Sequence, residues 1–214
     1  MNEKTMAWET ALQYVLDTTY AELERANLRW ALIGSVASAL QGCPVTPWDI
    51  DLLACTPDVV ERFASLMSPH AATSPADAER RQVDWLSYLE EPVSVHRDDY
   101  GYLWHFGRWF VADFQVEMAH IAPPEGHPGT SWAGGIWEAG PKIWPHLRQV
   151  PFAGHQVPVV PLEIQLGTNL ERGLQERVDQ IVECLRQDEY DRKLLDRSLA
   201  PRYRDEIRRL LQGS

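Results

Sequence analysis

Apolar and polar positions alternate with different periods along this chain, and each period predicts a different element. Between residues 8 and 26, apolar side chains recur every three or four positions, which predicts an amphipathic helix. The apolar run at residues 29–33 predicts a strand that ends at Gly34-Ser35, where a short helical segment begins. A second apolar stretch, residues 49–53, predicts the next strand.

The segment from residue 57 to residue 106 predicts a helix, a loop and two short strands. Residues 57–67 have helical spacing and begin with Pro57, a residue favoured in the first turn of a helix. Residues 68–82 are rich in Ser, Pro and Ala, which predicts a loop with one short helical piece. Residues 92–96 and 102–106 are short runs typical of strands, and polar residues separate them.

The longest predicted strand spans residues 109–120 and starts after a turn at Gly107-Arg108. Alternation along this strand places Asp113 and Glu117 on one face. The opposite face is almost entirely apolar and is expected to pack on the core. The polar face therefore supplies two candidate functional carboxylates.

Residues 122–146 predict a long loop, because prolines and glycines interrupt the apolar runs. Three tryptophans lie in this segment (Trp132, Trp137 and Trp144), and we expect them to anchor the loop rather than to line a pocket. Residues 149–160 then predict a hairpin, whose prolines favour a position at a sheet edge or outside the sheet.

The C-terminal part of the chain is predicted to be helical. Residues 161–185 carry an apolar stripe with a period of 3.6 residues, which we interpret as one helix. Shorter helices are expected at residues 190–199 and 201–211. The pattern therefore predicts two units, an α/β domain over residues 1–160 and a helical subdomain over residues 161–214.

Composition places the chain among ordinary globular proteins. Its 214 residues are enough for one sizeable domain with a small second unit, and 44% of them are apolar. The formal net charge is −11, and no Lys/Arg-rich block precedes the C-terminal helices. This balance makes extended nucleic-acid binding an unfavoured function and is compatible with a cationic substrate.

Targeting signals and cysteine usage predict the compartment. The chain has no basic segment followed by an apolar core at its start, and no run of about 18 apolar residues. Its three cysteines, Cys43, Cys55 and Cys184, have no metal-ligand spacing. We therefore expect a reduced cytoplasmic protein that does not span a membrane.

Two aspartates alternate with apolar residues in the predicted strand at residues 49–53. Side chains two positions apart on a strand point to the same face, so Asp49 and Asp51 are expected to project together. Two adjacent carboxylates repel each other unless a cation neutralises them. An all-oxygen site of this kind suits Mg²⁺.

The turn at Gly34-Ser35 belongs to the same hypothesis. A glycine between a strand and a helix lets a phosphate approach the backbone, and the free amide groups that follow can bind its oxygens. The Ser35 hydroxyl adds a donor. A third carboxylate, Glu117 or Asp113, would complete the site as a metal ligand or as a base for an attacking hydroxyl.

This combination resembles the DNA polymerase β-like nucleotidyltransferase superfamily, in particular its small antibiotic-modifying and toxin–antitoxin-type members. That superfamily carries an apolar residue, Gly, then Gly or Ser, a spacer, and Asp-apolar-Asp/Glu-apolar. Here Ile33-Gly34-Ser35 is followed, after thirteen residues, by Asp49-Ile50-Asp51-Leu52. Residues 152–163 also resemble the hairpin and helix entry that follow the catalytic domain in those proteins.

The resemblance implies a fold and an activity. The fold would be α+β, a mixed β-sheet of the nucleotidyltransferase type flanked by helices and followed by a small C-terminal helical unit. The activity would be Mg²⁺-dependent transfer of a nucleoside monophosphate from an NTP such as ATP to a hydroxyl acceptor. The acceptor could be a small molecule such as an antibiotic, a tRNA end or a protein side chain.

The resemblance also assigns roles to residues. Asp49 and Asp51 would bind Mg²⁺, and Gly34 and Ser35 would contact the nucleotide phosphates. Glu117 fits the third carboxylate best.

Asp113 is the alternative third carboxylate. The chain departs from the family pattern at Val45 and Asn169, where basic residues are often found. Arg172 or Arg177, expected on one helix, would then meet the phosphate charge.

Two other functions stay open at this stage. A non-catalytic protein of the same fold, such as an antitoxin or a binding protein, is compatible with the departures at Val45 and Asn169. A Mg²⁺-dependent nuclease needs only the carboxylates and leaves Gly34-Ser35 without a role. No Walker-type glycine loop and no recognisable Ser-His-Asp spacing suggests a further class.

Overall fold

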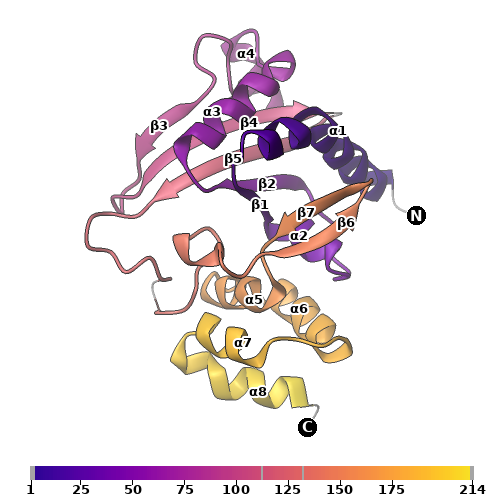
Figure 1. Cartoon of the computed structure of the whole chain (residues 1–214), viewed down its shortest axis with the longest axis vertical. Helices are drawn as coiled ribbons and strands as arrows, with labels where there is room; N and C mark the ends of the chain where they lie inside the picture. Colours follow the sequence, from indigo (N-terminus) through magenta and orange to yellow (C-terminus); the bar gives the residue numbers. More distant parts are fainter. Residues whose placement is uncertain (1–2, 112, 132, 213–214) are drawn as a thin grey trace.

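A computed structural model describes residues 3–111, 113–131 and 133–212 of the chain, and it consists of one mixed sheet with helices on it and beyond it (Figure 1). In chain order the elements are α1 (Glu3–Arg25), β1 (Trp30–Ile33), α2 (Gly34–Leu40), β2 (Asp49–Ala54), α3 (Pro57–Leu66), η1 (Ser68–His70), α4 (Pro75–Arg81), β3 (Ser94–Arg97), β4 (Leu103–Val111), β5 (Phe114–Ala122), η2 (Pro141–Ile143), β6 (Arg148–Phe152), β7 (His155–Val159), α5 (Leu162–Glu171), α6 (Gln175–Gln187), α7 (Arg192–Ser198), η3 (Pro201–Tyr203) and α8 (Arg204–Gln212).

The sheet has seven strands in the order β3-β4-β5-β2-β1-β7-β6. Two neighbouring pairs are parallel, β2 with β5 and β1 with β7, and the other pairs are antiparallel. The predicted α+β class with a mixed sheet is confirmed. The β6–β7 hairpin lies at one edge, where Pro151 and Pro158 cost the sheet few hydrogen bonds.

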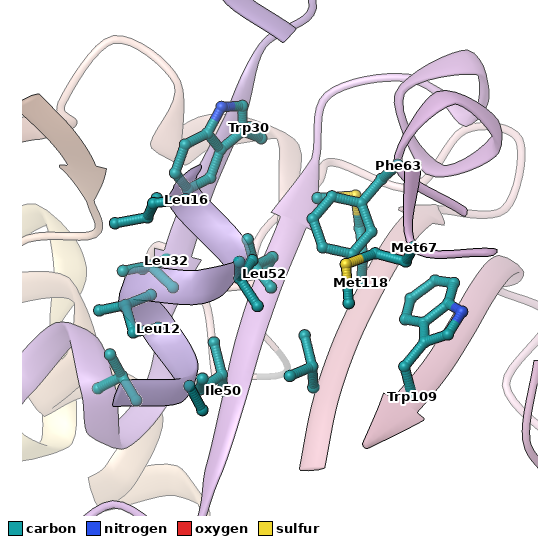
Figure 2. Close-up of a cluster of buried hydrophobic side chains, with 14 of the residues drawn as sticks. Leu12, Leu16, Trp30, Leu32, Ile50, Leu52, Phe63, Met67, Trp109 and Met118 are labelled. Atoms are coloured by element: carbon teal, nitrogen blue, oxygen red, sulfur yellow. The ribbon is translucent and has the colours of Figure 1, made fainter. Parts of the chain in front are cut away.

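Helices α1 and α3 cover one face of the sheet, and the main core lies beneath them (Figures 1 and 2). Leu12 and Leu16 of α1 pack with Ile50 and Leu52 of β2. Phe63 of α3 meets the Trp109 ring of β4, with the ring centroids 5.3 Å apart, and Met67 and Met118 are buried beside them (Figure 2). Because Ile50 and Leu52 point into this core, their neighbours Asp49 and Asp51 point to the opposite face.

The second face of the sheet is covered by the β5–β6 loop and by α5. A separate apolar cluster there joins Ala31 and Leu53 of the sheet to Ile143 of the loop and Ile164 of α5. The far side of α5 packs in a third cluster with helices α6, α7 and α8, at the end of the molecule away from α3 (Figure 1). Helix α5 therefore connects the sheet with the C-terminal helices.

The single strand predicted at residues 109–120 is wrong, because the chain reverses between Val111 and Phe114. Strands β4 and β5 form an antiparallel hairpin in which Val111 pairs with Phe114. Asp113 lies at the turn with φ +62°, a left-handed conformation that aspartate tolerates better than most residues. Apolar residues on both sides of the turn hid it from the alternation pattern.

The turn predicted at Gly107-Arg108 is also wrong, since both residues lie inside β4. Gly107 is needed there because the Trp109 ring folds over it: a Cβ at position 107 would lie 2.1 Å from the ring. Arg108 points to the other face of the sheet, beside β5.

The predicted helix at residues 161–185 is two helices, α5 and α6, separated by a short break. Gly173 ends the first with φ +68°, as glycine commonly does after a helix C-terminus. Arg172 therefore lies at the end of α5 and Arg177 on α6, not on one helix. Across the described part of the chain, no helix combines the length and the apolar character needed to cross a membrane.

Candidate active site

Four residues on four adjacent strands lie side by side on the face of the sheet opposite the main core. Ile33 pairs with Asp51, Asp51 pairs with Glu117, and Glu117 pairs with Arg108. Directly paired residues on neighbouring strands project to the same face. Asp49, two positions before Asp51 on β2, faces the same way. The sheet thereby brings together three of the carboxylates predicted from the sequence.

These carboxylates line a cavity of about 460 Å³, which we call the carboxylate cleft. Its walls come from the sheet, from the β5–β6 loop and from helices α5 and α6. Its polar lining consists of Asp49, Asp51, Glu117, Glu138, Thr168, Arg172 and Arg177, with the backbone of Gly34. The cleft thus contains both acidic and basic groups from distant parts of the chain.

Gly34 is required by the geometry of the cleft. It has φ +65°, and a Cβ at this position would lie 2.9 Å from Oδ2 of Asp51. Any other residue would be strained and would push against the carboxylate. Ser35 follows at the start of α2; its Oγ is buried, lacks a hydrogen-bond partner in the described structure, and is not part of the cleft lining.

Burial raises the pKa of Asp51 well above its usual range. The neighbouring charges of Asp49, Glu117 and Glu138 raise it further, and Arg172 opposes them. Without a counter-ion, Asp51 therefore favours its neutral form. A cation in the cleft would reverse this preference.

Glu117 is held by a cation that the sequence pattern did not reveal. Burial raises the pKa of Glu117, whereas Arg108 lowers it through its charge and a hydrogen bond. The Arg108 Nε atom donates to Glu117 Oε1 at 2.6 Å, and Gln115 Nε2 donates to the same oxygen at 2.8 Å. Arg108 also pairs with Asp84. The turn wrongly predicted at residue 108 is the reason why this partner was missed.

Asp113 lies apart from the cleft. Its side chain, at the β4–β5 turn, is 84% exposed and pairs with Arg81 at 2.5 Å. The expectation that it shares the face of Glu117 on one strand is wrong. Of the two candidates for a third carboxylate, Glu117 is the one that the sheet places beside Asp51.

Glu138, in the β5–β6 loop, is a fourth carboxylate in the cleft and was not predicted. It is only 5% exposed, and its Oε2 atom has no hydrogen-bond partner among the described residues. Burial raises its pKa, while Arg172, the Gly34 backbone and Arg177 counteract the rise. No motif identifies Glu138; the only sequence signal is its position between the apolar residues Trp137 and Ala139.

The basic groups of the cleft come from the C-terminal helices. Arg172 and Arg177 both line it, although they lie on different helices. Asn169 is buried and donates from Nδ2 to the Gln165 carbonyl at 2.8 Å, so it serves the interior of α5. Position 169 therefore supplies no cation to the cleft, and the two arginines supply positive charge instead.

The tryptophans of the β5–β6 loop differ in role. Trp137 lines the carboxylate cleft, contrary to the expectation that it only anchors the loop. Trp144 does anchor it, since the Arg29 guanidinium lies 5.4 Å from its ring centroid and donates to its carbonyl. Trp132 lies outside the described residues.

The donor set of the cleft fits a hard divalent cation at Asp49 and Asp51. Both are carboxylates on one face of β2, and their mutual repulsion contributes to the raised pKa of Asp51. Glu117 is engaged by Arg108 at 2.6 Å. Within the part of the chain that the structure describes, no three acidic, His or Cys side chains already converge as a metal site. Glu117 would join a metal only by giving up part of its contact with Arg108.

Comparison with solved structures places this fold. A crystal structure of a "putative nucleotidyltransferase" from Thermotoga maritima superimposes with a TM-score of 0.53 and 18% identity, covering 85% of this chain and 94% of that chain. The antibiotic-resistance factor ANT(2″)-Ia aligns at a TM-score of 0.39 and 14% identity in solution, over 96% of this chain and 91% of that one. Its crystal structure with adenylyl-2″-tobramycin aligns at 0.41 and 13%, over 92% and 97%.

Neither protein-family models nor curated proteins match the sequence. The structural likeness shows that the chain has a nucleotidyltransferase fold, as the motif predicted.

Proposed function

We propose that this protein is a nucleotidyltransferase that moves a nucleoside monophosphate from an NTP to a hydroxyl acceptor. One observation carries the proposal: Asp49, Asp51 and Glu117 share one sheet face, directly beside the Gly34 turn. A phosphate chain needs close backbone approach, and metal-assisted phosphoryl transfer needs adjacent carboxylates. A nuclease would need only the carboxylates, so a nuclease function would not explain why a glycine lies against Asp51.

Asp49 and Asp51 would hold Mg²⁺, and the ion would supply electrophilic stabilisation of the phosphoryl oxygens. The open space at Gly34 admits a phosphate next to Asp51, where a Cβ would not fit. Arg172 and Arg177 line the same cleft and complement the remaining phosphate charge.

Glu117 is suited to the acceptor side of the reaction. Burial raises the pKa of Glu117, which makes it a better acceptor for the proton of a hydroxyl. The bond from Arg108 orients one carboxylate oxygen and leaves the other for the acceptor.

The test compares Asp51, which lines the carboxylate cleft, with Asp113, which lies outside it. Pyrophosphate release and transfer of label from α-labelled NTPs would be measured with Mg²⁺ for the wild type, Asp51→Asn and Asp113→Asn. We expect Asp51→Asn to lose at least a hundredfold in rate, corresponding to about 2.7 kcal/mol of transition-state stabilisation. Asp113→Asn, exposed at the turn, should keep wild-type rates. Undiminished pyrophosphate release by Asp51→Asn would refute the proposal.

A second candidate is a non-catalytic protein of the same fold. It is favoured by the ion pair that engages Glu117 with Arg108 and by the Asn169 side chain that is turned into α5. Calorimetry with Mg²⁺ and each of the common NTPs separates the two. Binding abolished in Asp51→Asn supports the enzyme, and no nucleotide binding by the wild type supports the second candidate.

A further inference from the structure

A second cavity adjoins the carboxylate cleft and is lined by aromatic rings. Its volume is about 500 Å³, and we call it the aromatic cavity. Four rings face it, those of Tyr100, Tyr102, Trp104 and Trp137. They come from the β3–β4 connection, from the start of β4 and from the β5–β6 loop. The end of α5 and Arg202 of η3 close the cavity on the other side.

The two cavities share part of their lining. Trp104, Trp137, Thr168 and Arg172 line both of them. A molecule bound among the aromatic rings therefore lies next to the carboxylate cleft.

The order of the strands assigns a side to each reactant. Across the sheet, the Gly34 turn at the end of β1 comes first, then Asp51 on β2, then Glu117 on β5, and then Trp104 on β4. The carboxylates thus separate the phosphate side from the aromatic side. In phosphoryl transfer the attacking and leaving oxygens lie roughly in line, on opposite sides of the phosphorus. With pyrophosphate at Gly34, the acceptor hydroxyl must come from the aromatic cavity.

Three of the four rings, those of Tyr102, Trp104 and Trp137, are held in place before any ligand binds. Trp104 donates from Nε1 to Asp98 at 3.0 Å, and the Tyr102 hydroxyl lies 3.2 Å from Nε2 of His127. The rings of Tyr102 and Trp137 meet edge to face, with centroids 5.5 Å apart. A preorganised aromatic wall binds a flat ring without a large ordering cost.

The charges that line the aromatic cavity are balanced, two carboxylates against two guanidinium groups, and the carboxylates already accept hydrogen bonds from the protein. Both oxygens of Asp98 already accept hydrogen bonds, from the Tyr100 and Tyr102 amides and from Trp104. Glu171 accepts from Ser131 Oγ at 2.5 Å.

The guanidinium groups of this cavity offer hydrogen-bond donors to an anionic group of a ligand. Two guanidinium groups line it, those of Arg172 and Arg202. The ligand that complements aromatic rings and guanidinium groups together is a planar aromatic ring with an anionic group.

We propose that the aromatic cavity is the acceptor site and that the acceptor is a nucleotide, with its base among the rings and its phosphate toward Arg202. This inference rests on the proposed function. A ribose hydroxyl oxygen forms a bond to the α-phosphorus of the NTP, and its proton passes to Glu117. The bond from the α-phosphorus to the bridging oxygen breaks, and pyrophosphate leaves with the electron pair. A free nucleotide and the terminal nucleotide of an RNA share this chemistry.

The experiment measures acceptor binding with the donor site already filled. Calorimetry would be performed with Mg²⁺ and a saturating non-hydrolysable NTP analogue. The four ribonucleoside 5′-monophosphates, a short oligoribonucleotide and tobramycin would then be titrated separately. Two variants test the cavity, Tyr100→Ala and Arg202→Gln, since both residues line it and neither lines the carboxylate cleft.

Two matched controls alter exposed residues elsewhere. Tyr14→Ala removes a half-exposed ring of α1, and Arg209→Gln removes an exposed cation of α8. We expect at least one monophosphate to bind, and each cavity variant to weaken it about tenfold, while the controls and the affinity for the NTP analogue do not change. Tighter binding of the oligoribonucleotide, with the same loss in both variants, would identify the RNA end as the source of that nucleotide.

Three results would overturn the inference. Tobramycin binding that Tyr100→Ala weakens would assign the cavity to a cationic acceptor. Weakened binding of the NTP analogue itself by Tyr100→Ala would assign the rings to the base of the donor. If both cavity variants bind the monophosphate with the same affinity as the control variants, the acceptor binds elsewhere. Absence of any NTP binding would instead remove the proposed function, and with it the acceptor role.

Discussion

Glu138 offers the sharpest test of the electrostatics of the carboxylate cleft. Folding buries this carboxylate to 5% exposure and leaves Oε2 without a hydrogen-bond partner in the described structure. An unsatisfied buried polar atom costs about 1–3 kcal/mol, and more when it is charged. Glu138→Gln keeps the shape and removes the charge. We therefore expect the variant to be more stable than the wild type by about 1–3 kcal/mol at pH 8.

The gain should depend on pH with a defined sign. The pKa of Glu138 is higher in the folded state than its usual value of 4.5, because burial disfavours the ionised form. Below that value the carboxyl is protonated in both states and no penalty exists. The wild type then loses stability as the pH rises through the folded pKa, whereas the glutamine variant does not.

Urea unfolding at pH 4.5 and pH 8 measures this difference, and thermal unfolding at pH 8 should show a shift of about 2–10 °C. Glu163→Gln is a matched control: Glu163 is also buried and its Oε2 also lacks a partner among the described residues, but its Oε1 accepts from Arg148 at 2.5 Å and from the Asp191 amide at 2.8 Å, so its charge is paired. Its substitution should destabilise the protein. A Glu138→Gln variant that is less stable than the wild type at pH 8, or equally affected at both pH values, would refute the reasoning.

Three further changes test other contacts of the cleft. Gly34→Ala should lower the free energy of unfolding by roughly 1–2 kcal/mol, because φ at this position is +65°. It should also weaken Mg²⁺ binding, because the new Cβ meets Asp51. An unchanged melting temperature would contradict the first expectation. Arg108→Gln should lower the free energy of unfolding, measured with urea, by about 1–3 kcal/mol at pH 7.5. The decrease should be smaller at pH 4, because Glu117 is then protonated. An equal decrease at both pH values would show that the ion pair is unimportant. Mg²⁺ affinity, measured by calorimetry, should rise with pH, because the pKa of Asp51 is raised and its proton must leave before the ion binds; an affinity that does not depend on pH speaks against Asp51 as a ligand.

Local patterns predicted those elements whose periodicity continues unbroken. The strand with Asp49 and Asp51 was recognisable because its apolar positions alternate with acidic ones and turn residues precede it. The same rule failed at the β4–β5 hairpin, where aromatic and β-branched residues continue through the turn and Asp113 stands alone as a signal. It failed again at Gly173, because the apolar stripe of α5 resumes in phase on α6.

The site was predictable to the extent that it depends on neighbours in the sequence. Gly34 and the two aspartates follow from one short motif, and Glu117 from its strand alternation. Arg108 and Glu138 reach the cleft through the pairing of β4 with β5 and through the path of the β5–β6 loop. Those contacts join segments that are distant in the sequence, and no spacing rule reports them.

The parallel pairing of β2 with β5 has a consequence for folding. Parallel strands cannot be joined by a tight turn, so Asp51 and Glu117 meet only after α3, α4, β3 and β4 have been placed between them in the chain. Closing so long a segment is entropically costly and slow relative to helix formation. We therefore expect the cleft to form late in folding. A refolding chain should recover helical signal first and the ability to bind a divalent ion only when the central strands have joined.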